Sequence, residues 1–462
     1  MAEYHVENFG CRASRSDGEA IAANLRQRGL VPAAQPADAQ VVIVNTCSVT
    51  AEADRQARAW LRRIRRQNPA ARVIVTGCYA QRAPQELAAL AEVDAVVGNS
   101  HKSLVADLAA RFVRDPDARP AASAFVPLAS LAPQVFHDAA FAHSELAALP
   151  FAADSQQTRP NLKVQDGCGN RCSFCIIPAT RGHSRSTPLD ACLDNVRHFV
   201  DFGGQELVLS GINLGRWGRD LEPVRRLEDL VDAILRVSGL PRLRLSSIEP
   251  MDWSADLLAL YGEFAAGDHP RLARHAHLPL QSGSDAILRR MHRRYRPWHY
   301  AERLARLRGS MPDAAIGADV MIGFPGETDA LFDESYRFIA AQPLTYLHLF
   351  PFSARPGTPA WELHRQNPTP AGAVQERMSA LRELVAERFR AFRSQFVGRP
   401  LSAVTIGSSD GKPTTEAVTD NFLKLTLDVA VAPNQMILAH VTRLTSDGIR
   451  GTAAGRTSQR CA

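Results

Sequence analysis

The sequence predicts an α/β protein in three parts: an N-terminal domain with a parallel sheet, a partial (β/α)6 barrel and a small C-terminal all-β barrel. Three patterns support this. Apolar runs alternate with helix-length segments over roughly the first hundred residues. Six further apolar runs, again separated by helix-length stretches, occupy the middle of the chain. The final stretch changes to short alternating runs with turn signals, which is typical of a small β-barrel.

Length and composition agree with a multidomain folded protein. The chain has 462 residues, of which 45% are hydrophobic and 22% are charged, so collagen-like and wholly disordered proteins are excluded. No apolar run reaches the roughly 18 residues that a membrane helix needs, and the first residues lack a leader pattern, so we expect a cytoplasmic protein without membrane association. The net charge of +6 permits an RNA partner without demonstrating one.

The N-terminal domain is predicted to span residues 1–113, and residues 114–153, rich in Ala, Pro and Ser, are predicted to form a linker. Each expected strand of this domain is followed by a helix, which favours a parallel sheet. The expected strands are Tyr4–Phe9, Val41–Thr46, Val73–Gly77 and residues 93–98, and the expected helices include Ser16–Arg28 and Ala51–Gln67.

The middle domain is predicted to span residues 154–397. Its six strand-like runs begin at Leu162, Glu206, Arg242, His275, Ala318 and Tyr346. Six β/α repeats predict an incomplete parallel barrel. A charged amphipathic helix from about Ala371 to Phe396 ends this domain, and residues 398–458 form the predicted β-barrel.

Three cysteines stand close together after the first predicted barrel strand. Cys168, Cys172 and Cys175 have the spacing Cys-x3-Cys-x2-Cys. In a protein that we expect to be cytoplasmic, such cysteines favour metal or redox chemistry over disulfides. Three thiolates can hold three corners of a four-iron cluster and leave the fourth iron open. A structural zinc loop is the alternative, but it would need a fourth ligand at suitable spacing.

A second set of cysteines, Cys11, Cys47 and Cys78, is scattered along the N-terminal domain, and each follows an apolar run. Because ligands gather at the carboxyl ends of parallel strands, these thiols could converge on a second cluster. The alternative is that they are small buried apolar side chains.

These segments resemble the methylthiotransferases of the radical S-adenosylmethionine (SAM) superfamily over nearly the whole chain. The most specific motifs are NTCSVT, GCYAQ, DGCGNRCSFCIIPATRGHSRS, LVLSGINLG, HLPLQSGSDAILRRMHRRY and GADVMIGFPGETD. The resemblance implies a radical SAM core, a C-terminal TRAM-like domain, and two 4Fe-4S clusters and SAM as cofactors. SSIEP and FSARPGTPA look most like the MtaB-type branch, which acts on N6-threonylcarbamoyladenosine at position 37 of tRNA.

The resemblance also implies a division of labour between the cysteine sets. Cys168, Cys172 and Cys175 would hold the cluster that cleaves SAM to a 5′-deoxyadenosyl radical, and Cys11, Cys47 and Cys78 would hold the auxiliary cluster that carries sulfur. The product would be the 2-methylthio derivative of the nucleoside. An electron donor of the flavodoxin or ferredoxin type and a sulfur source would be required.

Several polar residues at or near the ends of predicted barrel strands are candidates for contacts with SAM or the nucleoside, because such loops form the site of a parallel barrel. They are Ser210, Gly211, Asn213, Glu249, Gln281 and Asp319. For each one, a structural polar role is the alternative.

Two groups of arginines are candidates for tRNA phosphate contacts. They are Arg55, Arg58, Arg62 and Arg66 on one face of a predicted helix, and Arg181 and Arg185 after the cysteine loop. A solvated charged face is the alternative.

Three other functions remain open from the sequence. The same scaffold could act on isopentenyladenosine in tRNA or on an aspartate of a ribosomal protein. A non-catalytic RNA-binding protein with structural zinc is the alternative of a different class.

Overall fold

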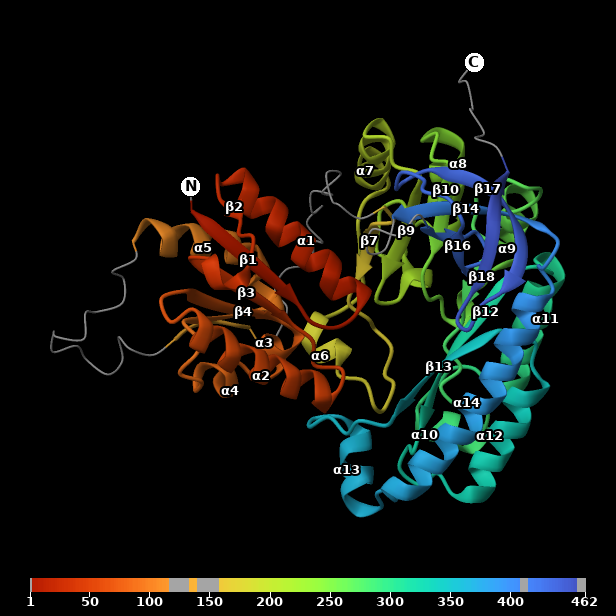
Figure 1. Cartoon of the computed structure of the whole chain (residues 1–462). Helices are drawn as coiled ribbons and strands as arrows, with labels where there is room; N and C mark the ends of the chain where they lie inside the picture. Colours follow the sequence, from red (N-terminus) through yellow and green to blue (C-terminus); the bar gives the residue numbers. More distant parts are fainter. Residues whose placement is uncertain (1, 116–132, 139–157, 408–413, 455–462) are drawn as a thin grey trace, which may run out of the picture. The chain divides into compact units, whose positions relative to one another are not determined.

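A computed structural model describes residues 2–115, 133–138, 158–407 and 414–454 (Figure 1). The chain divides into two compact units. Unit 1 combines residues 1–152 with residues 166–185 and 353–361, and unit 2 contains the remainder. None of the helices in the described ranges is long and apolar enough to cross a membrane.

Unit 1 is built on a parallel sheet with the strand order β2-β1-β3-β4-β5-β6. Its strands are β1 Glu3–Asn8, β2 Val31–Pro32, β3 Val41–Thr46, β4 Arg72–Gly77, β5 Ala95–Gly98 and β6 Gln134–Phe136. The expected strands are all present. Strand β6 differs from the expectation of a linker over 114–153, because it pairs with β5; most other residues of that segment lie outside the described ranges.

Helices cover both faces of this sheet, as Figure 1 shows. Trp60, Leu61 and Ile64 of α2 pack on one face, whereas Leu25 of α1 and Phe112 of α5 pack on the other. The amphipathic pattern of α2 explains its burial, and Thr50 caps it by accepting a hydrogen bond from the Ala53 amide (3.2 Å). The helices are α1 Arg12–Gln27, α2 Ala51–Gln67, α3 Cys78–Arg82, α4 Pro84–Ala88, α5 Val105–Arg114 and α6 Ile177–Arg181.

Unit 2 contains the predicted six β/α repeats. The strands are β7 Asn161–Asp166, β9 Glu206–Gly211, β10 Arg242–Leu245, β11 His275–His277, β12 Ala315–Ile322 and β13 Tyr346–Pro351, with a short β8, Arg185–Ser186, beside β7. The pairs β7–β9, β9–β10, β11–β12 and β12–β13 are all parallel. A parallel bridge between Leu243 and Leu272 continues the array from β10 toward β11.

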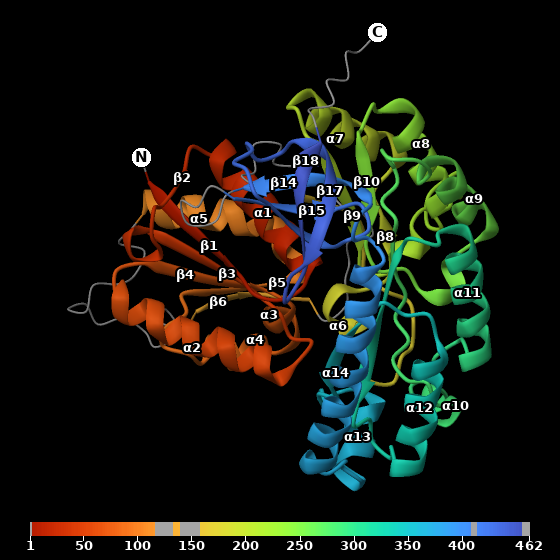
Figure 2. The same cartoon turned by 45° about the vertical axis from the view of Figure 1, so that its right-hand side comes forward.

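The helices between these strands follow one another around them (Figure 2). They are α7 Leu189–Asp201, α8 Leu227–Val237, α9 Ala255–Phe264, α10 Asp285–Arg290, α11 Pro297–Ser310 and α12 Asp329–Ala341. Two more helices, α13 Pro359–Gln366 and α14 Ala371–Ser394, follow β13. The expected long helix is α14, which ends two residues before the expected Phe396.

The C-terminal residues form a closed five-stranded barrel in the order β14-β15-β16-β18-β17. Its strands are β14 Pro400–Gly407, β15 Thr415–Thr419, β16 Lys424–Leu427, β17 Met436–Leu444 and β18 Ile449–Ala454. Closure removes the free strand edges that a small sheet would otherwise expose. The predicted fold class is confirmed in all three parts.

A buried charge cluster joins this small barrel to the larger one. Glu206 is fully buried, and Arg244 Nε donates to its Oε1 (2.7 Å). Arg244 also donates to the carbonyls of Asp420 (3.1 Å) and Thr419 (2.9 Å) in the small barrel. Burial raises the pKa of Glu206, but Arg244, Arg159 and Arg242 outweigh it and hold the pKa well below its usual range.

Candidate functional site

The N-terminal cysteines lie at the carboxyl ends of three adjacent strands. Cys11 follows β1 and precedes α1, Cys47 follows β3, and Cys78 follows β4 and opens α3. The register pairs Asn8 with Asn45 and Thr46 with Gly77, so the three strands end nearly level. The topology therefore brings together residues that are far apart in the sequence.

Two further observations show how closely these thiols approach. Gly10 has φ +106°, and a Cβ at this position would lie 2.7 Å from Cys47 Sγ. Burial raises the pKa of Cys47 to about 12, and the nearby Cys78 and Cys11 thiols add to this rise. The set is free of disulfides and combines two buried thiols with the exposed thiol of Cys11.

The second set occupies the loop between β7 and α6. The Cys168 amide donates to the Gly182 carbonyl (3.0 Å), and the Cys175 amide donates to the Cys172 carbonyl (3.1 Å). Gly167 has φ +72°, and a Cβ there would collide with the His183 carbonyl oxygen at 1.9 Å. The backbone thus folds the loop tightly, and all three cysteines remain partly exposed.

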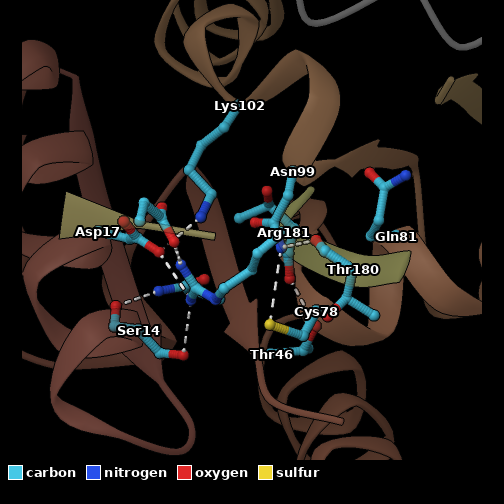
Figure 3. Close-up of polar contacts among 12 residues, drawn as sticks. Ser14, Asp17, Thr46, Cys78, Gln81, Asn99, Lys102, Thr180 and Arg181 are labelled. Carbon is cyan, nitrogen blue, oxygen red and sulfur yellow. Dashed lines mark hydrogen bonds and ion pairs between the residues drawn. The ribbon is translucent and has the colours of Figure 1, made fainter. Parts of the chain in front are cut away.

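Arg181 links this loop to helix α1 in the N-terminal part of unit 1 (Figure 3). Its guanidinium is 1% exposed; Nη1 donates to Asp166 Oδ1 (3.0 Å) and Nη2 to Asp17 Oδ2 (3.0 Å). Burial lowers the pKa of Arg181, but Asp166, Cys78 and Asp17 raise it well above its usual value. Lys102 Nζ also contacts Asp17 (2.6 Å). The predicted phosphate contact of Arg181 is therefore not supported, because a buried, doubly paired side chain does not face solvent.

Asn99 makes a second link between the same regions. Its Nδ2 donates to the Thr180 carbonyl (2.8 Å) and to Cys78 Sγ (3.6 Å), as Figure 3 shows. One amide group therefore contacts both an N-terminal cysteine and the helix that follows the cysteine loop.

The segment 353–361 makes a third link. The Ala360 amide donates to the Ser173 carbonyl (2.8 Å), between Cys172 and Cys175. Arg355 is buried, donates to Ser48 Oγ (2.8 Å) beside Cys47, and also pairs with Asp54. This segment therefore binds a residue next to each cysteine set, and all of these residues belong to unit 1.

The candidates after β9 form a tightly bonded loop in unit 2. Ser210 Oγ donates to the Leu162 carbonyl (3.4 Å), and the Asn213 amide donates to Gln165 Oε1 (2.7 Å). A Cβ at Gly211 would lie 2.9 Å from the same Gln165 oxygen. Gln165 is fully buried and was not identified from the sequence, since an isolated Gln in a strand carries no pattern.

The remaining candidates for cofactor contacts have different environments. Glu249 Oε2 accepts from Arg293 Nη2 (2.5 Å), so its carboxylate is already paired. Gln281 is buried with φ +65°, and its Oε1 has no hydrogen-bond partner among the described residues. Asp319 lies between His277 and His348. Contacts of these residues with a cofactor stay predictions.

The arginine candidates for tRNA contact separate into paired and exposed side chains. Arg55 pairs with Glu52 (2.6 Å), and Arg58 pairs with Glu86 (2.9 Å). Arg62 and Arg66 are exposed on the same helix. Arg185 is partly buried and donates to the Arg181 carbonyl (3.0 Å). Among these candidates Arg62 and Arg66 remain the best suited to contact a phosphate.

The chain is similar to curated proteins over most of its length. It is 32% identical over 428 residues to a threonylcarbamoyladenosine tRNA methylthiotransferase MtaB of Bacillus subtilis, covering 92% of this chain and 90% of the relative. It is 34% identical over 400 residues to the MtaB of Aquifex aeolicus, covering 87% and 92%.

The chain belongs to the MtaB-type methylthiotransferase family. Residues 3–98 match the uncharacterized protein family UPF0004, and residues 162–339 match the radical SAM superfamily. Membership makes the chain a radical SAM transferase and argues against the structural-zinc alternative. A tRNA-2-methylthio-N(6)-dimethylallyladenosine synthase of Sphingopyxis alaskensis is also similar, at 33% identity over 400 residues, covering 86% of this chain and 85% of the relative.

Solved structures support the fold of this MtaB-type chain. The radical SAM methyltransferase TsrM of Kitasatospora setae, solved with cobalamin and a [4Fe-4S] cluster, aligns with a TM-score of 0.55 at 15% identity, covering 79% of this chain and 78% of TsrM. The residues present suit iron–sulfur clusters, because two sets of three cysteines are available without disulfides. The buried Arg181 cation also lies near Cys78 and Cys11, and cluster thiolates are anionic.

Proposed function

We propose that this protein converts N6-threonylcarbamoyladenosine at position 37 of tRNA to its 2-methylthio derivative. The observation that carries the proposal is the arrangement of six cysteines as two sets of three within unit 1. The local set, Cys168, Cys172 and Cys175, lies in one loop and is partly exposed. The assembled set, Cys11, Cys47 and Cys78, is brought together at the carboxyl ends of strands of the N-terminal sheet. Two sets support two 4Fe-4S clusters with different tasks.

The cysteine loop would bind the cluster at which SAM is cleaved. Cys168, Cys172 and Cys175 provide three ligands, and the hydrogen bonds from Cys168 to Gly182 and from Cys175 to Cys172 hold the loop's shape. Such a cluster supplies one electron to SAM, and the resulting carbon radical removes the hydrogen of an unactivated C–H bond, which no side chain can do by acid–base chemistry. An external electron donor of the flavodoxin or ferredoxin type would then reduce the cluster again.

The N-terminal set would bind the auxiliary cluster that carries the sulfur to be transferred. Cys47 and Cys78 are buried, which protects their sulfur atoms from solvent, whereas Cys11 is exposed and leaves one side of the set accessible. Arg181 places a permanent positive charge near Cys78 and Cys11, and a positive charge suits ligands that are anionic when they bind a cluster. A sulfur source would restore the transferred atom after each turnover.

Residues at the carboxyl ends of the barrel strands would bind SAM. Ser210 and Asn213 lie at and after the end of β9, where Gln165 fixes the loop. Gln281 offers a buried carbonyl oxygen that has no partner in the described part of the chain. A buried acceptor of this kind costs free energy unless a ligand donates to it, so the SAM amino group or ribose is a suitable partner.

Purified tRNA substrates can test the assignment directly. The anaerobically reconstituted protein, supplied with SAM, a reductant and sulfide, should methylthiolate tRNA that carries threonylcarbamoyladenosine. It should leave tRNA that carries isopentenyladenosine unchanged. Mass spectrometry of the digested nucleosides reports both results. Conversion of only the tRNA that carries isopentenyladenosine would contradict the proposal and would indicate the activity named for the Sphingopyxis relative.

Exposed arginines of α2 would contact the tRNA backbone, and the salt dependence of binding can test this. Replacing Arg62 and Arg66 with Gln should reduce the slope of log affinity against log salt by roughly 0.7 to 0.9 for each lost contact. Replacing Arg55 and Arg58, which already pair with Glu52 and Glu86, is the matched control and should have a smaller effect. An unchanged slope in the variant without Arg62 and Arg66 would show that this face of α2 contacts solvent and not tRNA phosphates.

A further inference from the structure

Three potential metal ligands, none of them a cysteine, gather on one face of the larger barrel's strands. His277 ends β11, Asp319 lies in β12 and His348 lies in β13. The parallel register pairs Asp319 with His348 and His277 with Gly317. Because side chains alternate between the faces of a strand, the three project from the same face of three adjacent strands.

The separations of their ligand atoms suit a metal ion better than hydrogen bonds. Asp319 Oδ1 lies 3.4 Å from His277 Nε2 and 3.3 Å from His348 Nδ1. One potential ligand atom from each of the three residues lies within 4.8 Å of the other two. An N–H···O hydrogen bond is usually about 2.9–3.0 Å long. Tetrahedral zinc with bonds of about 2.0–2.1 Å holds its ligand atoms about 3.3–3.4 Å apart.

The burial of His277 is a second observation that points to a ligand. The His277 side chain is 9% exposed, and its Nε2 makes no hydrogen bond within the described ranges. A buried imidazole nitrogen facing a carboxylate without a bond is unfavourable, and coordination would satisfy it.

The neighbouring residues support the two imidazoles and leave one side open. The Tyr346 ring stacks on His277 with a centroid separation of 6.1 Å and lies 5.3 Å from His348. Gly317 makes room for this ring, since a Cβ there would lie 2.1 Å from the Tyr346 Cζ. The His348 side chain is 60% exposed. A bound ion would therefore keep a position open to water or to an oxygen of a substrate.

We propose that His277, Asp319 and His348 form a binding site for a divalent first-row metal ion, with Zn²⁺ the expected occupant. Two imidazoles and one carboxylate are a recurrent ligand set for zinc with an open fourth position. This role differs from the SAM contact predicted for Asp319. It does not depend on the proposed function.

Metal analysis of the reconstituted full-length protein tests the site. After iron–sulfur reconstitution and removal of loose metal with a chelator, the protein should bind about one Zn²⁺ per chain in an equilibrium titration. Co²⁺ in place of Zn²⁺ should give the absorption of a nitrogen and oxygen site, without thiolate-to-cobalt charge transfer. The exposed His348→Gln variant should weaken binding by more than the roughly 10- to 100-fold that loss of a supporting outer residue costs.

A matched control uses another His–Asp pair, which belongs to no group of three potential metal ligands among the described residues. His101 Nε2 lies 3.8 Å from Asp138 Oδ2, so His101→Gln should leave zinc binding unchanged. Asp319→Asn, which preserves size, should weaken binding as His348→Gln does, with an unchanged iron content showing that each variant is folded. Absence of zinc binding by the parent protein, thiolate charge transfer with Co²⁺, or full binding by both variants would overturn the proposal.

Discussion

Each cysteine set contains three thiols, but the two sets are formed in different ways. Cys168, Cys172 and Cys175 are neighbours in the sequence, and short backbone hydrogen bonds shape their loop. Cys11, Cys47 and Cys78 are brought together only by the order of three parallel strands. The first set is partly exposed, whereas the second contains two buried thiols. A local set can be recognised from spacing alone, but an assembled set depends on the whole sheet and on its neighbours.

The largest expected effect comes from removing the local set. Changing Cys168, Cys172 and Cys175 to Ala should leave about half of the iron and abolish 5′-deoxyadenosine formation, because the open iron that binds SAM would be lost. Anaerobic iron and sulfide analysis with a SAM cleavage assay measures this. Cys192→Ala is the control, since Cys192 is buried in α7 and donates to the Thr187 carbonyl (3.6 Å). Full iron and cleavage in the triple variant would contradict the assignment.

Removing the assembled set should separate the two activities. With Cys11, Cys47 and Cys78 changed to Ala, about half of the iron should remain, and SAM should still be cleaved reductively because the other loop is intact. Transfer of the methylthio group should be lost, since no sulfur is held. Nucleoside analysis together with deoxyadenosine measurement reports the two steps. A variant that still formed methylthio product would show that these cysteines do not carry the sulfur.

Replacing Arg181 measures how much the buried ion pairs between the two cysteine sets contribute to the stability of the protein. Arg181→Met leaves Asp166 and Asp17 without their shared cation, and breaking a buried pair on one side costs roughly 3–5 kcal/mol. Lys102 still pairs with Asp17, so the loss should lie near the lower end of this range. Denaturant unfolding measures it, with exposed Arg62→Met as the control within about 0.5 kcal/mol. A loss below about 1 kcal/mol would show that the network is dispensable.

Asn99 provides the smallest and most selective test. Hydrogen bonds to cluster sulfur favour the reduced state, so Asn99→Leu, which removes the donor to Cys78 Sγ, should lower the auxiliary cluster's potential. A bond of roughly 0.5–1.5 kcal/mol corresponds to about 20–65 mV for one electron. Redox titration followed by electron paramagnetic resonance measures the shift, and the second cluster of the same sample is the control. Equal shifts in both clusters would exclude a selective role for Asn99.

The sequence predicts the fold well where the patterns are periodic. All four expected N-terminal strands, all six barrel strands and the closed C-terminal barrel are present. Strand β6 could not be foreseen, because three residues, two of them exposed, form a strand only when an existing sheet edge pairs with them. Cys168, Cys172 and Cys175 were found from their spacing, whereas the assignment of Cys11, Cys47 and Cys78 to a cluster also needed the family resemblance of the motifs around them.

The supporting residues of the site carry no comparable pattern. Arg181 was a candidate for phosphate contact because it is a basic residue that follows the cysteine loop, and only the tertiary structure shows that it is buried and paired with Asp17 and Asp166. Gln165, Asn99 and Arg355 were not identified for the same reason, since each acts on a residue distant in sequence. Polar residues that connect distant segments become visible only when the chain is folded.

The discontinuity of unit 1 has a consequence for biosynthesis. The contact between Arg355 and Asp54 spans 301 residues, and the hydrogen bond from the Ala51 amide to Ser353 Oγ (3.0 Å) spans 302. Contacts this distant in sequence form late, because the chain must be synthesised before its ends can meet. Residue 361 must leave the ribosome before unit 1 has all its segments. The N-terminal sheet can therefore emerge long before the segment that binds beside both cysteine sets, and cluster insertion before that point would meet an incomplete site.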